Sequence, residues 1–171
     1  MALSILKEIQ LSLLNQMLQK GLINNEFEHL MISKRAQDPQ SVVQTIEEYC
    51  AEVEAILSQM KNDIDTPEVV FSHLMASCEL VKDKSIRIGS VLVSSTCMLL
   101  IRACDERNKK TSKMHVQLRQ VHINIYNFRF SLILELLKND FSTTQSQLEV
   151  YARMERRIII VQIDEAGSSS F

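Results

Sequence analysis

The chain has 171 residues, of which 46% are apolar and 23% are charged, and its formal net charge is -2. This length predicts one domain with a sizeable core, and the composition is ordinary for a globular protein. The small net charge gives no general attraction to nucleic acid or to anionic membranes, so partners of those classes are not expected. Only 3 glycines and 2 prolines occur, which favours long helices over many short strands.

The N-terminal segment predicts a helix that ends near Gly21, a residue suited to the position just past a helix end. Its apolar residues follow helical spacing: Leu3, Leu6, Ile9, Leu13, Met17 and Leu18. It lacks a basic start and a small-residue cleavage site, and polar residues interrupt it, so neither a signal peptide nor a membrane span is expected. Residues 21–30 then predict a turn and a short helix.

A long helix is predicted to start at Asp38 and Pro39, because an aspartate caps well and proline suits the first helical position. Its buried face should comprise Val42, Val43, Ile46, Tyr49, Cys50, Val53, Ile56, Leu57 and Met60. Thr66 and Pro67 predict the start of the next helix by the same logic.

In that next helix one apolar face is formed by Phe71, Leu74, Met75, Cys78 and Val81. At about 100° per residue, Glu79 falls near the edge of this face, on an outward stripe with Ser72, Ala76 and Asp83. A turn is predicted at residues 83–85, followed by a helix to about Arg107. Residues 108–112 then predict a polar connector.

The last part of the chain predicts helices over residues 114–121 and 139–163, with a flexible tail at 164–171. Residues 122–137 differ from the rest, because their apolar residues alternate almost strictly, which is the period of a strand. Such an apolar, alternating run is also an aggregation hazard if it has no sheet to join.

The run ELVKDKSIRIGS at residues 79–90, followed by TCMLLIRACDERN at 96–108, resembles the histidine-containing phosphotransfer (HPt) proteins of plant cytokinin signalling. The family motif reads HQLKGSSSSIGA, followed by a helix with a pattern like NACVQFRNFCEQQN. Lys82, Ile88, Gly89, Cys97, Cys104 and Asn108 fall in register without a gap. In this register Glu79 stands where the family has its phosphate-accepting histidine.

The resemblance implies an all-α fold: a four-helix bundle with helices starting near Asp38, Thr66, Ser85 and Lys109, and extra N-terminal helices packed on one end. A single domain over residues 1–163 is expected. Relative to the family, residues 122–137 are extra, and we interpret them as an inserted segment that the bundle does not need. The alternative is a longer hydrophobic helix or a hairpin arm particular to this protein.

The resemblance also implies a pseudo-phosphotransfer protein, which binds receiver domains of hybrid histidine kinases and response regulators without carrying phosphate. The expected docking surface comprises Ser72, Ala76, Glu79, Lys82, Asp83 and Ser85. Such a protein is a binding module rather than an enzyme, would dampen signalling, and would work in the cytoplasm and nucleus. Two alternatives stay open: an active phosphorelay mediator that uses another residue, such as His73, and a non-functional product carrying the insert.

The other candidate groups predict no further chemistry. We interpret His29, His73, His115 and His122 as surface or boundary histidines rather than phosphate carriers. No Cys, Asp or Glu stands at ligand spacing beside His115 and His122, so a metal site is not expected. The four cysteines show no CxxC spacing and are interpreted as reduced core thiols. No phosphate-binding glycine loop or hydrolase motif occurs, so no cofactor and no small-molecule substrate are expected.

Overall fold

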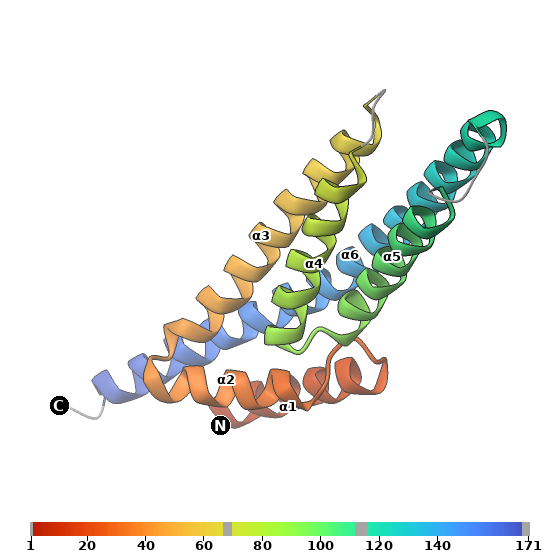
Figure 1. The fold of residues 1–171 in the computed structure, drawn as a ribbon. Coiled ribbons are helices and arrows are strands. Elements are labelled where there is room, and N and C mark those ends of the chain that lie inside the picture. The colour runs from red at the N-terminus through yellow and green to blue at the C-terminus, as the bar shows by residue number, and fades with distance from the viewer. Residues whose placement is uncertain (1, 67–69, 112–115, 169–171) are drawn as a thin grey trace.

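The computed structural model describes residues 2–66, 70–111 and 116–168, and this part of the chain is all-α (Figure 1). Its six helices are α1 (Ala2–Gln19), α2 (Asn25–Gln37), α3 (Gln40–Ile64), α4 (Phe71–Ile88), α5 (Val91–Thr111) and α6 (Val116–Ser168). Helices α3 to α6 form a four-helix bundle, and α1 and α2 cross its lower end in Figure 1. The predicted fold class is therefore confirmed.

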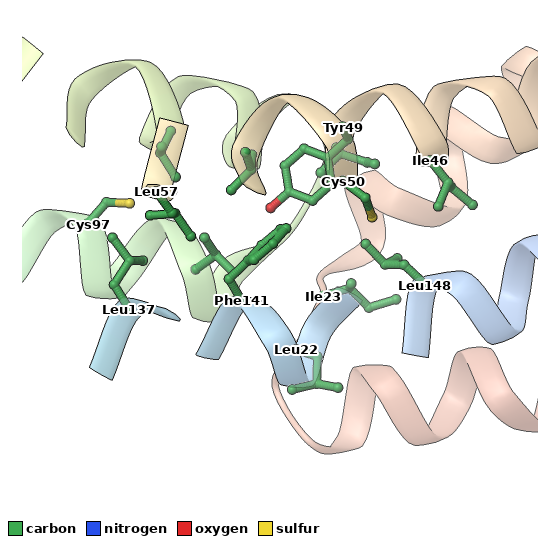
Figure 2. Close-up of a cluster of buried hydrophobic side chains, with 14 of the residues drawn as sticks. Leu22, Ile23, Ile46, Tyr49, Cys50, Leu57, Cys97, Leu137, Phe141 and Leu148 are labelled. Carbon is green, nitrogen blue, oxygen red and sulfur yellow. The ribbon is translucent and has the colours of Figure 1, made fainter. Parts of the chain in front are cut away.

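The start of α3 agrees with the predicted cap, because the Asp38 carboxylate accepts a hydrogen bond from the Gln40 N–H at 3.2 Å. The predicted inner face of α3 is buried, with Ile56 only partly so. Figure 2 shows part of this face, where Tyr49 and Cys50 of α3 point toward Phe141 and Leu148 of α6. The Tyr49 and Phe141 rings meet edge to face, with their centroids 6.3 Å apart.

Three predicted boundaries are wrong. Helix α4 continues through residues 83–85 and ends at Ile88, so the next helix starts at Val91 rather than at Ser85. Residues 108–111, predicted as a connector, are the last turn of α5, and Lys109 therefore starts no helix. Helix α4 begins at Phe71, after an extended Val70, so the predicted start at Thr66 is also wrong. Residues 67–69 lie outside the described residues.

Helix α6 is the largest departure from the predicted elements. It runs unbroken for 53 residues, through the segment 122–137 and five residues into the predicted tail. Phe130, Leu134 and Leu137 from that segment are buried in the main core. The strand period was therefore misleading, and the alternative of a longer hydrophobic helix describes what is observed.

The segment is tied to the bundle through Phe71, the first residue of α4. The Phe71 ring meets the Phe130 ring edge to face, with centroids 5.6 Å apart. The Arg107 guanidinium of α5 also lies over the Phe71 ring, 3.6 Å from the ring centroid. Three helices thus meet at one aromatic ring, and the segment forms part of their packing.

The turn between α4 and α5 holds the N-terminal helices in place. Gly89 has a left-handed backbone (φ 79°), and its carbonyl accepts a hydrogen bond from the Asn24 N–H at 2.9 Å. The Val91 N–H in turn donates to the Leu22 carbonyl at 3.1 Å. A Cβ atom on Gly89 would lie 2.5 Å from the Phe27 backbone nitrogen, so only glycine fits here.

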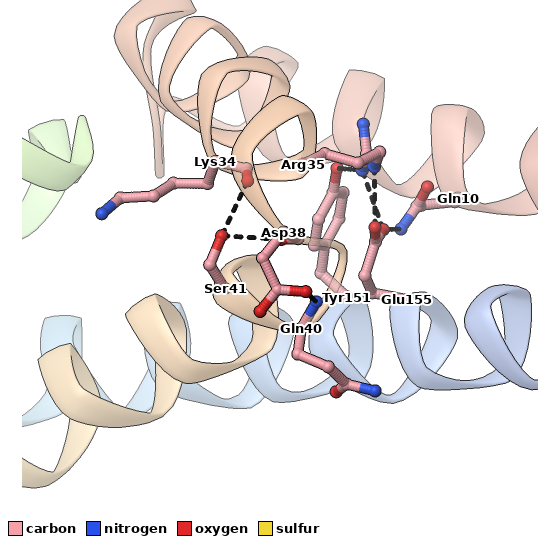
Figure 3. Close-up of polar contacts among 8 residues, drawn as sticks. All are labelled: Gln10, Lys34, Arg35, Asp38, Gln40, Ser41, Tyr151 and Glu155. Carbon is pink, nitrogen blue, oxygen red and sulfur yellow. Dashed lines mark hydrogen bonds and ion pairs between the residues drawn. The ribbon is translucent and has the colours of Figure 1, made fainter.

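A second attachment of the N-terminal helices is a buried charge on α6 (Figure 3). Glu155, 1% exposed, accepts two hydrogen bonds from the Arg35 guanidinium of α2, at 2.7 and 2.8 Å. Gln10 of α1 donates a further bond to the same carboxylate. Because a buried carboxylate is tolerated only when its oxygens are satisfied, this network fixes where α1 and α2 lie against α6.

We predict that Gly89→Ala destabilises the protein much more than Gly21→Ala. Both glycines have positive φ values, of 79° and 66°, so both substitutions carry the left-handed penalty of roughly 1–2 kcal/mol. Gly21 has nothing within 4 Å of an added Cβ, whereas Gly89 would also overlap Phe27, adding roughly 1–3 kcal/mol. Urea unfolding of both variants measures the difference, and equal losses would contradict the close approach.

We also predict that Phe130→Ala lowers the free energy of unfolding by about 3–5 kcal/mol, because it opens a cavity in the core. Ile160→Ala is the control, on the same helix and 56% exposed, and should change stability by less than about 0.5 kcal/mol. Deleting residues 122–137 should abolish cooperative thermal unfolding. A deleted form that melts cooperatively while the full chain does not would show instead that the segment is foreign to the fold.

Candidate functional site: the outer face of α4

The outward stripe of α4 lies where the helical period places it. Ser72, Ala76 and Asp83 are exposed, and the Glu79 side chain is 44% exposed. Exposed apolar side chains, Leu80 and Ile86, accompany them on the outer side of the helix. The result is a convex helix surface with acidic, small and apolar groups.

Glu79 has an intramolecular partner, Lys82, one turn along α4. The Lys82 ammonium donates a hydrogen bond to Glu79 Oε2, and this bond, above all, raises the pKa of Lys82. Burial raises the pKa of the Cys97 thiol of α5 most, and both charges act on the same thiol: Lys82 lowers its pKa and Glu79 raises it. Position 79 is therefore a charged, half-exposed site on the outer side of α4.

Ser85 does not belong to this exposed surface, which corrects the predicted docking set. It is fully buried, and its hydroxyl lies 2.9 Å from the Tyr49 hydroxyl of α3. Because α4 does not turn at residues 83–85, Ser85 stays in phase with the buried residues Cys78, Val81 and Ile88. That spacing of three and four residues was the signal in the sequence that could have placed it inside.

Lys84, beside Ser85, is turned toward α3. Its ammonium forms an ion pair with the Glu52 carboxylate at 2.6 Å. Asp83 and Arg87 remain exposed. The exposed end of α4 thus carries a carboxylate and a guanidinium where the family motif has a glycine and a serine.

The histidines are scattered. His73 is exposed on α4 and His29 is exposed on α2, while His122 is half-buried on α6 with its ring 6.4 Å from the Tyr126 ring. His115 lies outside the described residues. Six residues separate His73 from Glu79, so the two side chains point about 120° apart around α4.

Among the described residues, no group of three His, Cys, Asp or Glu side chains could hold a metal ion. A groove of about 390 Å³ lies between α3 and α6, away from Glu79, with the Glu47–Arg156 ion pair and Cys50 along it. Burial raises the pKa of the Cys50 thiol to about 12, which is the opposite of what a nucleophilic cysteine needs.

None of the six helices, over the residues described, combines the length and apolarity needed to cross a bilayer.

The fold is that of plant HPt proteins: a rice HPt structure superimposes with a TM-score of 0.77 at 20% identity, covering 92% of this chain and 99% of the rice chain. A maize HPt structure gives 0.74 at 21% identity, covering 90% and 99%. An HPt structure from Medicago truncatula gives 0.72 at 16% identity, covering 91% and 94%.

The sequence shows the same relationship. The chain is 21% identical over 159 residues to histidine-containing phosphotransfer protein 2 of rice, covering 92% of this chain and 95% of that protein. To histidine-containing phosphotransfer protein 1 of rice it is 22% identical over 125 residues, covering 73% and 85%. No protein-family model matches. In both sequence and fold the chain is therefore similar to plant HPt proteins.

We predict that the cysteines react slowly with iodoacetamide at pH 8 in the folded protein and rapidly in denaturant. All four thiols are buried and free, and burial raises the pKa of Cys97 to about 12 and that of Cys104 to about 11. Mass spectrometry after timed alkylation measures the rates. Cys50, 6% exposed, should be the first to react, and rapid labelling of Cys78 or Cys97 in the folded state would contradict the packing.

The same thiols give stability a pH dependence. Because the folded thiols ionise above their ordinary value of 9.0, the unfolded chain alone loses these protons between about pH 9 and 11. Their contribution to stability is therefore intact below pH 9 and is lost as the pH rises.

Proposed function

We propose that this protein is a pseudo-phosphotransfer module: it docks on receiver domains of a two-component phosphorelay and carries no phosphate. The observation that carries the proposal is Glu79, a half-exposed carboxylate on the outer face of α4, in the run that aligns with the phosphate-accepting motif of the HPt family. A protein of this kind would compete with active HPt relatives for receivers and so dampen cytokinin-type signalling in the cytoplasm and nucleus.

The chemical argument concerns the acceptor atom. Transfer from a receiver's aspartyl phosphate requires a nucleophile that can hold a labile phosphoryl group, and an imidazole nitrogen does this in the family. A carboxylate is a poor acceptor, and the acyl phosphate that it would form is itself labile. In addition, the Glu79 carboxylate is already paired with Lys82, the cation that would otherwise help to balance phosphoryl charge.

The neighbouring departures from the family motif weaken docking without removing the surface. Asp83 replaces a glycine, adding a side chain and a negative charge where a receiver presents its own acidic pocket. Ile86 and Arg87 replace serines, and both are exposed. Electrostatic repulsion and added bulk predict weaker binding than that of an active relative.

A phosphate-mimicking role for Glu79 is less well supported than simple occupation of the receiver. A carboxylate carries one charge and lies flat, whereas a phosphoryl group carries more charge and three acceptor oxygens. Its contact with Lys82 on the same helix further reduces the charge presented outward.

The second candidate function is an active mediator that uses His73. The observation in its favour is that this imidazole is exposed on the same helix, α4. Against it stands the rotation of about 120° from the Glu79 stripe, which would require a receiver to dock in another orientation. The third candidate, a non-functional product, is disfavoured by the core positions of Phe130, Leu134 and Leu137.

We predict that incubation with a phosphorylated receiver leaves no acid-labile label on the unmodified protein, and that Glu79→His gains label. The substitution supplies an imidazole at a half-exposed position without disturbing the core, so folding should be unchanged. Phosphohistidine is lost in acid but survives alkali, whereas an acyl phosphate is lost in alkali. Treating separate samples with acid and with alkali therefore identifies the labelled group.

Two controls make the result specific. Glu79→Gln removes the charge without adding an acceptor, so it should bind receivers at least as well as the unmodified protein and should still take no label. Ala76→Arg places a bulky cation on the same surface and should abolish binding, whereas Ser142→Arg, exposed on α6, should not. Stable label on the unmodified protein that maps to His73 would overturn the proposal in favour of the active mediator.

A further inference from the structure

The first half of α6 carries an apolar stripe that nothing in the described part of the chain covers. It consists of Leu118, Val121, Ile125, Phe128, Leu132 and Leu136, which are between 45% and 66% exposed. The steps between them are three and four residues, the spacing of a coiled-coil seam. We call these six residues the α6 stripe.

The α6 stripe explains the strand-like alternation in the sequence. Residues two apart on a helix point about 200° apart, so alternating apolar residues supply two opposite helix faces. One face, with Tyr126, Phe130, Leu134 and Leu137, is buried. The other face is the stripe, and folding of a single copy does not account for its apolar character.

We propose that a second copy of this chain covers the α6 stripe, in a two-fold symmetric, antiparallel pair of α6 helices. In this register Ile125 of one copy packs beside Phe128 of its partner, and Val121 packs beside Leu132. Each contact occurs twice, so a single stripe is complementary to itself. The proposal concerns α6 alone and does not depend on the function proposed for α4.

The charge pattern favours a second copy over a charged partner. Over the span of the stripe, residues 118–136, the sequence contains three charged residues, Arg119, Glu135 and, between the central members of the stripe, Arg129. The Arg129 guanidinium is already paired with Glu106 of α5, at 2.9 Å. A neutral apolar seam offers no electrostatic guidance to a charged surface, and it presents no like charges to its own copy.

The area is also sufficient. Six side chains about half exposed offer roughly 600 Å² in each copy, and a pair would therefore bury about 1,200 Å², the lower bound of stable interfaces. Phe128, the largest and most exposed member at 66%, lies in the middle of the stripe, where binding energy usually concentrates.

The test is the oligomeric state of the full chain, measured by analytical ultracentrifugation over a wide concentration series. We expect a monomer–dimer equilibrium, with the dimer dominant at high concentration. Ile125→Glu, which buries a charge in the seam, should raise the dimer Kd at least about 100-fold. The matched control is Ile160→Glu: both isoleucines are on α6 and 56% exposed, but Ile160 lies outside the stripe. It should leave the Kd unchanged.

Orientation is tested by disulfide formation between chains. A mixture of Ile125→Cys and Phe128→Cys proteins should cross-link 125 to 128 in excess over either like pair. A chain that is monomeric at every concentration, or a dimer that survives Ile125→Glu, would overturn the proposal, and dominant 125-to-125 links would overturn the antiparallel arrangement. Circular dichroism melts of both glutamate variants establish that the comparison is made between folded proteins.

Discussion

The packing of this protein depends on one buried face of α6, which extends over residues 126–158. Its members recur every three or four residues: Tyr126, Phe130, Leu134, Leu137, Phe141, Thr144, Leu148, Tyr151, Glu155 and Ile158. Helices α1, α3 and α5 all pack on α6, so the position of each is set by contact with a portion of this buried face. A shift of phase anywhere along α6 would turn the remaining portion away from its partners.

The two attachments of the N-terminal helices work by different physical means. At Gly89 the approach is of backbone on backbone, which requires the absence of a side chain. At Glu155 it is a buried carboxylate that requires a guanidinium, and here Arg35 supplies it. One is steric and the other electrostatic, and together they orient α1 and α2 against both the α4–α5 turn and α6. The outer face of α4 is thereby held in a fixed position relative to the rest of the molecule.

The parts of the fold that could be predicted from the sequence are those where a local signal agrees with the tertiary outcome. The α3 core face and the Asp38 cap are of this kind, as is Gly21 at the end of α1. The turn predicted at residues 83–85 is wrong because the polar residues there are as compatible with a helix as with a loop. The strand period of residues 122–137 was misleading because apolar residues on two opposite faces of a helix produce the same alternation in the sequence as a strand.

For the candidate site, periodicity placed Ser72, Ala76, Glu79 and Asp83 on one outward stripe, and the structure adds the Glu79–Lys82 ion pair. The meaning of position 79 came from the resemblance to HPt proteins. Long-range contacts, such as Tyr49 with Ser85 or Phe71 with Phe130, have no local signature and could not have been predicted. The burial of Ser85, by contrast, was missed because a turn was predicted at residues 83–85, although its helical spacing from Cys78 and Val81 was a local signal.

The length of α6 has a consequence for motion in solution. At 1.5 Å per residue, 53 residues span about 80 Å, far more than a sphere of this mass would. The chain must therefore tumble as an elongated body, with slow end-over-end rotation and fast spinning about its long axis. The backbone N–H bonds of α3 to α6 point roughly along that axis, whereas those of α1 and α2 lie at an angle to it (Figure 1). The nitrogen-15 relaxation rates of the two groups of helices should therefore differ.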